Sequence, residues 1–359
     1  MSSDWSSDVC SSDLEAPPRV AAPRPAADCR VANSLGLACR AAACLDVGDA
    51  SALQAALAWC TQRGLRPLPL GAGSNVLLPE RLPRAVLRSS DDSLRELACD
   101  RESVRLRVGA GRDWHRLVVD CLQREYFGLE NLALIPGTVG AAPVQNIGAY
   151  GVELASFVEA VHGVDLDSGE ARQLAPQDCA FAYRDSVFKG ALRQRFMITA
   201  VDLRLLRQPR LCLDYPSLAR RVEQGPLPPT PYSVFDAVVA IRRERLPDPR
   251  QLPNAGSFFT NPLVSAAQAA ALRARYPELP AQPQGDGRCK LSAAWMIERC
   301  GLRGARRGGA GVAAQHALVL VNHGATRAEL LRLAEEVRAA VRARFGCDLG
   351  IEPQVIDGE

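Results

Sequence analysis

The sequence lacks the features that mark membrane proteins and nucleic-acid-binding proteins. No run of residues approaches the roughly 18 consecutive apolar positions that span a bilayer, so we expect a soluble protein without a membrane partner. The net charge is only +3, and the 43 basic residues are spread along the chain instead of forming a patch. Nucleic acid is therefore a poor first hypothesis. Small anionic ligands stay open, because a few placed arginines suffice to bind them.

Histidine is scarce, and cysteine is frequent but unorganised. The four histidines show no ligand spacing with the thiols, so no metal site is predicted. The twelve cysteines contain no CxxC pair and no signal peptide precedes them, whereas a secreted disulfide scaffold would be short and cysteine-dense. We expect mostly buried or free reduced thiols in a cytoplasmic protein.

A chain of 359 residues is too long for one ordinary core, so two or three domains are expected. Residues 1–28 differ in kind from the rest. They repeat Ser-Ser-Asp three times and then become rich in alanine and proline, without any apolar period. Such a stretch cannot bury enough surface to order itself, so we predict a disordered or foreign tail.

Apolar periodicity places helices and strands in the remainder of the chain. Helices are expected at 49–60, 113–124, 291–300 and 327–345, strands at 104–108 and 196–205, and a hairpin at 158–164 with 171–174. A pair of short strands around 65–70 and 76–78 flanks a glycine turn. Strands and helices thus mix without the regular alternation of a doubly wound sheet, which favours an α+β architecture.

The segment Gly71-Ala72-Gly73-Ser74-Asn75 forms that glycine turn. Two glycines separated by one residue let a backbone approach a ligand closely and present N–H groups to phosphate oxygens. The segment lacks the Gly-Lys-Ser/Thr ending of a P-loop and the third glycine of a dinucleotide fingerprint. Taken alone, it is better explained as a plain tight turn.

A second glycine-rich segment, residues 136–151, has four glycines and almost no charge. We do not expect it to form a helix, and its few side chains favour a flat ligand lying against the backbone. Val139, Val144, Ile147 and Tyr150 are residues of the buried type, and they argue for an ordered wall over a disordered loop.

Three shorter segments each carry one polar residue whose role the residues alone leave open. Arg184, between Tyr183 and Asp185, fits either a structural ion pair or a bidentate partner for a carboxylate. Ser257 follows a glycine, and a turn serine usually bonds its own backbone. No G-x-S-x-G motif supports a hydrolase. Glu352 precedes a proline in extended backbone and would ordinarily be a solvated edge residue.

Together and in this order, these segments resemble the UDP-N-acetylenolpyruvoylglucosamine reductase family, which acts in peptidoglycan precursor synthesis. The resemblance runs from Asn33 to Val355, and the tract 212–246 resembles the longer type of the family, with an extra loop over the substrate. Its anchors are Gly71 to Asn75, Gln145 to Gly151, Tyr183 to Ser186, Gly256 to Phe259 with Asn261-Pro262, and Ile351 to Pro353.

The resemblance implies an α+β fold with an FAD-binding domain pair of the PCMH type, as in vanillyl-alcohol oxidase, and a smaller C-terminal α/β substrate domain. The implied parts are the FAD-binding region 29–208, a substrate-loop and linker region 209–246, a substrate-binding domain 247–345, and a segment 346–359 that returns to the FAD site. A cytoplasmic monomer is expected.

The family pattern also assigns site residues. FAD would be cradled by Gly71, Ala72, Gly73, Ser74, Asn75, Gly137, Thr138, Gly140, Ala141, Ala142, Gln145, Asn146, Gly148, Ala149 and Tyr150. The UDP-sugar would be held by Tyr183, Tyr215, Arg245, Asn261 and His316. Ala141-Ala142 stands where the longer type commonly has two serines, Arg245 where lysine is frequent, and His316 where glutamine is usual.

The same resemblance implies that NADPH reduces FAD and leaves, after which UDP-N-acetylglucosamine enolpyruvate enters the same cleft. Hydride addition to the terminal enolpyruvyl carbon develops negative charge, which Arg184 would stabilise. Ser257 would donate the proton. Glu352 would belong to the site as a carboxyl kept protonated by burial.

Two alternatives stay open at this point. One is another flavin oxidoreductase of the same fold with a different substrate. A proton donor at Ser257 disfavours this alternative, because an alcohol oxidase needs no acid at the reacting carbon. The other is a nucleotide-binding flavoprotein without turnover, which would require a broken site. None of Arg184, Ser257 and Glu352 is missing.

Overall fold

The computed structural model describes residues 29–225 and 228–358. The predicted tail 1–28 lies outside the described residues. Within the described ranges, no helix combines the length and the apolar character needed to cross a membrane. Most of the cysteines in these ranges are buried, and Cys39, Cys60, Cys121, Cys179 and Cys347 are buried free thiols.

A small parallel sheet opens the fold. Its elements are β1 (Arg40–Val47), α1 (Ala50–Gln62), β2 (Arg66–Pro69) and β4 (Arg81–Ser89), with strand order β1-β4-β2. The sequence analysis predicted α1 but no strand at 40–47. Helix α1 begins after Asp49, whose carboxylate accepts a hydrogen bond from the Ala52 N–H at 2.7 Å. It buries Leu53, Ala56 and Cys60 on the face that periodicity predicted.

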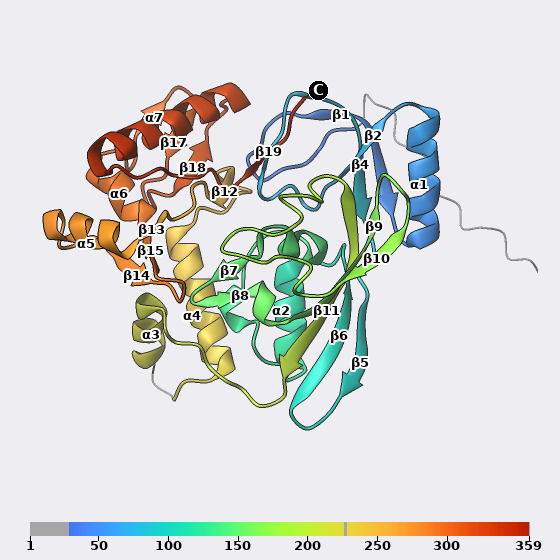
Figure 1. The fold of residues 1–359 in the computed structure, drawn as a ribbon, viewed down its shortest axis with the longest axis horizontal. Helices are drawn as coiled ribbons and strands as arrows, with labels where there is room; N and C mark the ends of the chain where they lie inside the picture. Colours follow the sequence, from blue (N-terminus) through green and yellow to red (C-terminus); the bar gives the residue numbers. More distant parts are fainter. Residues whose placement is uncertain (1–28, 226–227, 359) are drawn as a thin grey trace, which may run out of the picture.

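A five-stranded antiparallel sheet follows, in the order β10-β9-β11-β6-β5. Its strands are β5 (Leu94–Cys99), β6 (Ser103–Gly109), β9 (Val158–Asp165), β10 (Ala171–Leu174) and β11 (Phe196–Leu206). Val104, Leu106 and Val108 of β6 share one core with α2 (Trp114–Gln123), because alternate side chains point to the same face of a strand. Figure 1 shows α2 beside this sheet, and the predicted strands, hairpin and helix are confirmed.

The glycine-rich segment contradicts one expectation, because residues Val139–Gln145 form a 3-10 helix, η3. Close packing explains how this glycine-rich turn is held. The Gly140 N–H donates to the Ala110 carbonyl at 2.9 Å, and a Cβ on Gly140 would lie 2.5 Å from the Ala110 Cβ. The neighbouring short elements are η2 (Glu130–Leu132), β7 (Gly148–Ala149), β8 (Val152–Glu153) and η4 (Leu154–Ser156).

Two helices, α3 (Pro216–Glu223) and α4 (Pro231–Arg245), lead into the C-terminal part and pack on the core of the antiparallel sheet. The C-terminal part contains β12 (Asn254–Ser257), β16 (Arg306–Arg307), β17 (Ala310–Val312) and β18 (Val319–Asn322) in one sheet and β13 (Leu263–Ser265), β14 (Ala281–Pro283) and β15 (Arg288–Leu291) in another. Its helices are α5 (Ala266–Arg275), α6 (Ala293–Arg299) and α7 (Arg327–Phe345), and α7 has the predicted bounds.

The end of the chain joins the two halves. Strand β19 (Gln354–Val355) pairs in parallel with β3 (Val76–Leu77), directly after the first glycine turn. Figure 1 shows β19 running from the C-terminal part toward the N-terminal sheet. The Glu352 N–H donates to the Phe258 carbonyl at 2.9 Å, so the residue after Ser257 and the residue before Pro353 are hydrogen-bonded. Segments far apart in the sequence therefore meet at this seam.

Candidate active site

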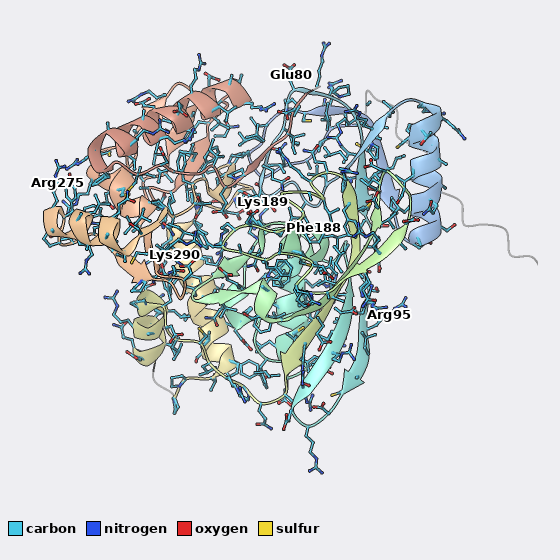
Figure 2. All side chains as sticks on the ribbon, viewed as in Figure 1. Glu80, Arg95, Phe188, Lys189, Arg275 and Lys290 are labelled. Atoms are coloured by element: carbon cyan, nitrogen blue, oxygen red, sulfur yellow. The ribbon has the colours of Figure 1, made fainter. Side chains whose placement is uncertain are left out.

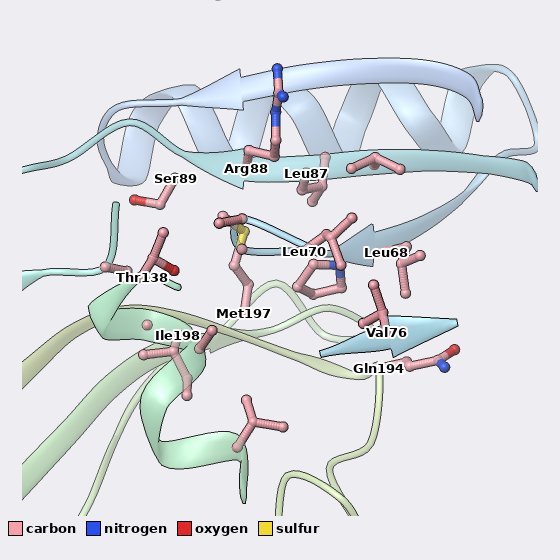
Figure 3. A pocket seen from close by; sticks show the side chains of 18 of the residues that line it. Leu68, Leu70, Val76, Leu87, Arg88, Ser89, Thr138, Gln194, Met197 and Ile198 are labelled. Atoms are coloured by element: carbon pink, nitrogen blue, oxygen red, sulfur yellow. The ribbon is translucent and has the colours of Figure 1, made fainter. Parts of the chain in front are cut away.

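A pocket of about 440 Å³ lies between the N-terminal sheet and the antiparallel sheet. Its walls come from residues 68–72, 86–90, 138–144 and 194–198. Figure 3 shows mostly apolar side chains, such as Leu68, Leu70 and Ile198, facing this space. A second cavity of about 110 Å³ shares Gly71, Ala72 and Thr138 with the first. The two cavities adjoin, are largely apolar and are bounded by both glycine-rich segments.

Most of the residues predicted to cradle a cofactor line these two cavities. They are Gly71, Ala72, Gly73, Ser74, Asn75, Gly137, Thr138, Gly140, Ala141, Ala142 and Gln145. Gly148, Ala149 and Tyr150 do not line either cavity and lie in and after β7. The predicted Asn146 is also elsewhere. Its side chain is buried and bonds Glu153, the Ala182 carbonyl and the Ala155 N–H, so it braces the backbone around the site.

Arg184 and Glu352 form an ion pair next to this seam. Arg184 Nε lies 3.2 Å from Glu352 Oε1, and Arg184 Nη2 donates to the Gly148 carbonyl at 2.5 Å. Arg184 has a left-handed backbone (φ 58°), which is costly for a residue with a side chain. Lys189 Nζ donates to the Arg184 carbonyl at 2.8 Å and supports this conformation. Contacts thus hold Arg184 both at its guanidinium and at its main-chain carbonyl.

Glu352 is a buried carboxyl, only 9% exposed. Burial raises its pKa, while the positive charges of Arg184 and Lys189 act in the opposite direction. Its backbone carbonyl accepts a hydrogen bond from Asn75 Nδ2 at 3.5 Å, and the same amide nitrogen bonds Gln145. Glu352 is therefore connected directly to the two glycine-rich segments.

Ser257 ends strand β12, next to the Phe258 carbonyl that binds the Glu352 N–H. It is half-buried, and its hydroxyl has no hydrogen-bond partner among residues 29–225 and 228–358. This differs from the ordinary turn serine, which bonds its own backbone. The hydroxyl is therefore free to donate to a ligand.

Tyr183 and Asn261 lie together beside Arg184. The Asn261 N–H donates to the Tyr183 hydroxyl at 3.4 Å, and the Asn261 side-chain oxygen accepts from the Ala293 N–H at 2.9 Å. The Arg184 guanidinium carbon lies 5.3 Å from the centre of the Tyr183 ring. Burial raises the pKa of Tyr183, so its hydroxyl stays protonated.

The remaining predicted ligand residues form a second group. The Tyr150 and Tyr215 rings contact edge-to-face, with centres 5.3 Å apart. Burial and the nearby charge of Arg245 lower the pKa of His316, which keeps its ring neutral at neutral pH. The charge of Arg245 also acts on Tyr150. The structure thus places Tyr150, Tyr215, Arg245 and His316 in one neighbourhood.

Sequence reasoning missed Arg242, on helix α4. Its Nε is buried and has no hydrogen-bond partner in the described part of the chain. Burial lowers the pKa of Arg242, and its charge acts on Tyr150. Arg242 lies four residues after the buried Val238, so both are on the same face of α4. An arginine within the apolar pattern of a helix is the sequence signal that could have identified this residue.

Comparisons with known proteins match two regions of the chain and nearly all of its length. Residues 248–356 match the family model for the C-terminal domain of UDP-N-acetylenolpyruvoylglucosamine reductase, and residues 41–174 match that for an FAD binding domain. The reductase of Chromobacterium violaceum is 46% identical over 332 residues, which cover 92% of this chain and 97% of that one. The Pseudomonas aeruginosa reductase is 47% identical over 325 residues, covering 90% of this chain and 96% of that one.

The chain belongs to the UDP-N-acetylenolpyruvoylglucosamine reductase family. A crystal structure of the reductase from Thermus caldophilus covers 90% of this chain and 96% of its own, with a TM-score of 0.63 and 24% sequence identity, which shows a shared fold. The predicted α+β fold, with an FAD-binding domain followed by a reductase C-terminal domain, is confirmed.

The reductase cavities fit FAD by two observations. The Gly71 backbone lies against Thr138 and Ala141, which leaves no room for a side chain between the two glycine-rich segments. Asn75 Oδ1 borders the second cavity, is buried and has no hydrogen-bond partner in the described ranges. The ring N–H of a flavin could donate the hydrogen bond that Asn75 Oδ1 otherwise lacks. The backbone N–H groups of the glycine turn could bind the diphosphate of FAD.

Gly71→Ala is therefore expected to weaken FAD binding by about tenfold or more. Its Cβ would lie 2.7 Å from Thr138 Oγ1 and 3.0 Å from the Ala141 Cβ, so the cradle must shift. Fluorescence titration of the apoprotein with FAD measures the change. Gly190→Ala is the matched control, because its Cβ meets nothing closer than 3.7 Å. Wild-type affinity in Gly71→Ala would show that FAD lies elsewhere.

Proposed function

We propose that this reductase saturates the enolpyruvyl ether of UDP-N-acetylglucosamine enolpyruvate, with FAD as cofactor and NADPH as reductant. The observation that carries the proposal is the position of Arg184. Its guanidinium is fixed by Glu352 at 3.2 Å and by the Gly148 carbonyl at 2.5 Å. The Glu352 backbone in turn bonds Asn75, which lines the second cavity, and Phe258, the residue after Ser257. A cation, a carboxyl and a hydroxyl then face one reacting group.

The two glycine-rich segments would hold FAD, which would supply hydride chemistry, with NADPH as the hydride source and the terminal enolpyruvyl carbon as the acceptor. Negative charge then develops on the adjoining carbon and spreads into its carboxylate. Arg184 supplies a fixed positive charge for that species, and a preorganised cation in a water-poor site needs no reorganisation during the reaction. Its two structural contacts keep the guanidinium in place before the substrate arrives.

Ser257 supplies the proton that completes the reduction. A serine hydroxyl is a weak acid, but the developing carbanion is a strong base, so the transfer is favourable over a short distance. The hydroxyl has no competing partner among the described residues, which keeps its hydrogen available to the substrate. The resulting alkoxide must be reprotonated by solvent before the next turnover.

Glu352 belongs to the site as a neutral carboxyl. Burial raises the pKa of Glu352, so the carboxyl accepts a proton more readily than a solvated one. In its protonated form it donates a hydrogen bond instead of opposing the developing negative charge. As pH rises through the raised pKa, the carboxyl ionises and repels the transition state. The substrate half of the reaction should therefore slow on the alkaline side.

Glu352→Gln is expected to remove most of that alkaline decrease, because an amide is neutral at every pH and still donates a hydrogen bond. The rate at which substrate reoxidises the reduced enzyme, measured by stopped flow across pH, gives the comparison. Ionising a group whose pKa is raised also destabilises the folded state as pH rises, so the variant should gain melting temperature relative to wild type at alkaline pH. The exposed Glu335→Gln serves as control. An unchanged alkaline limb in Glu352→Gln would assign the titration to another group.

The UDP-sugar itself is held by Tyr183, Tyr215, Arg245, Asn261 and His316. Support comes from their grouping around Arg184 and Tyr150. Arg245 is exposed at the end of α4, where it offers a cation to a diphosphate. His316, as a neutral ring whose Nδ1 accepts the Leu318 N–H at 3.3 Å, offers its other nitrogen as a donor.

We also propose a role for each region of the chain. Residues 29–208 bind FAD, residues 209–246 carry the substrate loop, residues 247–345 form the substrate-binding domain, and residues 346–359 return to the FAD site. The enzyme would act as a cytoplasmic monomer that binds no nucleic acid and no membrane, consistent with its dispersed charge and its small-molecule substrates.

An isotope experiment tests the function. Turnover with deuterated NADPH should place one deuterium on the terminal carbon of the product, and turnover in D₂O should place one on the adjoining carbon, as mass spectrometry and NMR of the sugar nucleotide would show. UDP-N-acetylglucosamine, which lacks the enolpyruvyl group, should not be reduced. NADPH consumption without a reduced sugar nucleotide would contradict the proposed function.

A further inference from the structure

Asn131 is a buried asparagine that joins two segments far apart in the sequence. It belongs to η2 and is only 2% exposed. Its side-chain Nδ2 donates to the Tyr150 carbonyl and to the Cys212 carbonyl, both at 2.9 Å. A carboxamide nitrogen carries two N–H groups, so this one atom satisfies two backbone acceptors at once. Asn131 lines neither of the two cavities.

The contact with Cys212 holds a segment that has few other attachments. Residues 208–214 form no helix or strand between β11 and α3. Apart from the packing of Leu213 on the core, the bond from Asn131 is the only hydrogen bond that joins them to the rest of the described residues. Tyr215 follows directly as the N-cap residue of α3, and it is one of the residues proposed to hold the UDP-sugar. The segment that leads to Tyr215 is therefore fixed at Asn131.

The contact with Tyr150 holds the turn between β7 and β8. Tyr150 has a left-handed backbone (φ 48°), which is costly for a residue with a side chain. A Cβ on the next residue, Gly151, would lie 3.2 Å from Cys212 Sγ, so the two segments are in close contact. The Tyr150 ring contacts the Tyr215 ring edge-to-face. Figure 2 shows side chains filling the space between α4 and the hairpin of β7 and β8.

We infer that Asn131 is a positioning residue for the UDP-sugar, an inference that rests on the proposed function. By binding both carbonyls, it fixes the spacing of the two segments and keeps the Tyr215 ring against Tyr150 before the substrate arrives. When the spacing is lost, only those molecules with Tyr215 in place bind at full affinity, and the apparent affinity falls with their fraction. Asn131 touches no reacting group, so the chemical steps should be unaffected once the substrate is bound.

Binding of UDP-N-acetylglucosamine enolpyruvate to the oxidised holoenzyme tests this inference. Asn131→Ala should weaken binding by about tenfold, while FAD content and the reoxidation rate at saturating substrate stay close to wild type. Its melting temperature should fall, because two carbonyls lose their donor. Asn322→Ala is the matched control, since Asn322 is also buried and its Nδ2 donates to the Leu35 carbonyl at 2.7 Å. This control should lose melting temperature and keep the wild-type affinity.

A double-mutant cycle separates positioning from general destabilisation. If Asn131 acts through Tyr215, Asn131→Ala should weaken binding much less in the Tyr215→Ala background than in wild type. Independent effects would multiply the two losses of affinity. Multiplied losses, or wild-type affinity in Asn131→Ala, would overturn the inference. So would an equal loss of affinity in Asn322→Ala.

Gly151→Ala tests the same spacing if Asn131→Ala does not fold. Gly151 is exposed, and its new Cβ would push against Cys212 Sγ, so a loss of affinity is again expected. Gly64→Ala is the control, because Gly64 also has a positive φ (63°) but its Cβ would meet nothing within 4 Å. Wild-type affinity in Gly151→Ala, or an equal loss in Gly64→Ala, would contradict the inference. Failure of the wild-type holoenzyme to bind the enolpyruvyl sugar would instead count against the proposed function.

Discussion

Ser257→Ala should leave the reduction of bound FAD by NADPH unchanged and slow its reoxidation by the enolpyruvyl sugar by about 10²- to 10⁴-fold, the usual contribution of a positioned general acid. The expectation follows from the seam at which β12 and the Glu352 segment are joined. The Ser257 hydroxyl has no hydrogen-bond partner there among the described residues. Its removal should therefore eliminate the proton donor without breaking a structural hydrogen bond.

Controls separate the acid from its surroundings. Ser257→Cys keeps a donor at the same position and should retain more activity than Ser257→Ala. Ser265→Ala removes the N-cap of α5, where Ser265 Oγ accepts the Gln268 N–H at 3.1 Å, and should change stability without changing either half-reaction. Equal slowing of both half-reactions in Ser257→Ala would count against the role of this serine as proton donor.

Arg184→Lys should impair the substrate half-reaction by about 10²-fold, although the charge is retained. An ammonium is a point charge and cannot reproduce the two directions in which the guanidinium now contacts Glu352 and the Gly148 carbonyl. The change also leaves a buried carboxyl with a weaker partner, so Glu352 should become harder to ionise.

Stopped-flow rates for each half-reaction give the measurement. The rate at which NADPH reduces FAD in the variant should stay closer to its wild-type value than the rate of the substrate step does. Arg195→Lys, an exposed residue paired with Asp167 at 2.5 Å, is the control for a change of head group elsewhere. A substrate rate in Arg184→Lys equal to that of wild type would remove Arg184 from the reacting centre.

The elements with strong apolar periodicity could be predicted from the sequence. Helix α7 has the predicted bounds of Arg327 to Phe345, and the alternating pattern of Val104, Leu106 and Val108 predicted β6, because burial of one face leaves a regular signature. Strand β1 has buried residues on both faces and no such alternation, so it went unnoticed.

The glycine-rich segment shows the limit of local reasoning. Its composition argued against a helix, yet Val139–Gln145 forms η3 because packing against Ala110 outweighs intrinsic propensity. Asn146, within the motif that carried the family resemblance, is fully used in backbone bracing and lies away from the cavities. Motif membership predicted the neighbourhood of the site and not which side chains face it.

Distances between segments could not be predicted without the fold. The pairing of Arg184 with Glu352 depends on β19 returning to β3, a contact between residues more than 270 positions apart. The interior position of Arg242 likewise follows from packing.

We propose that one site binds NADPH to reduce FAD and then binds the enolpyruvyl sugar, which receives the hydride and a proton from Ser257. Anaerobic stopped-flow absorbance of the wild-type holoenzyme tests it most directly. NADPH should bleach the yellow flavin, and UDP-N-acetylglucosamine enolpyruvate, added next without oxygen, should restore the colour with formation of the saturated product. A flavin that NADPH bleaches and the enolpyruvyl sugar fails to reoxidise would contradict the account.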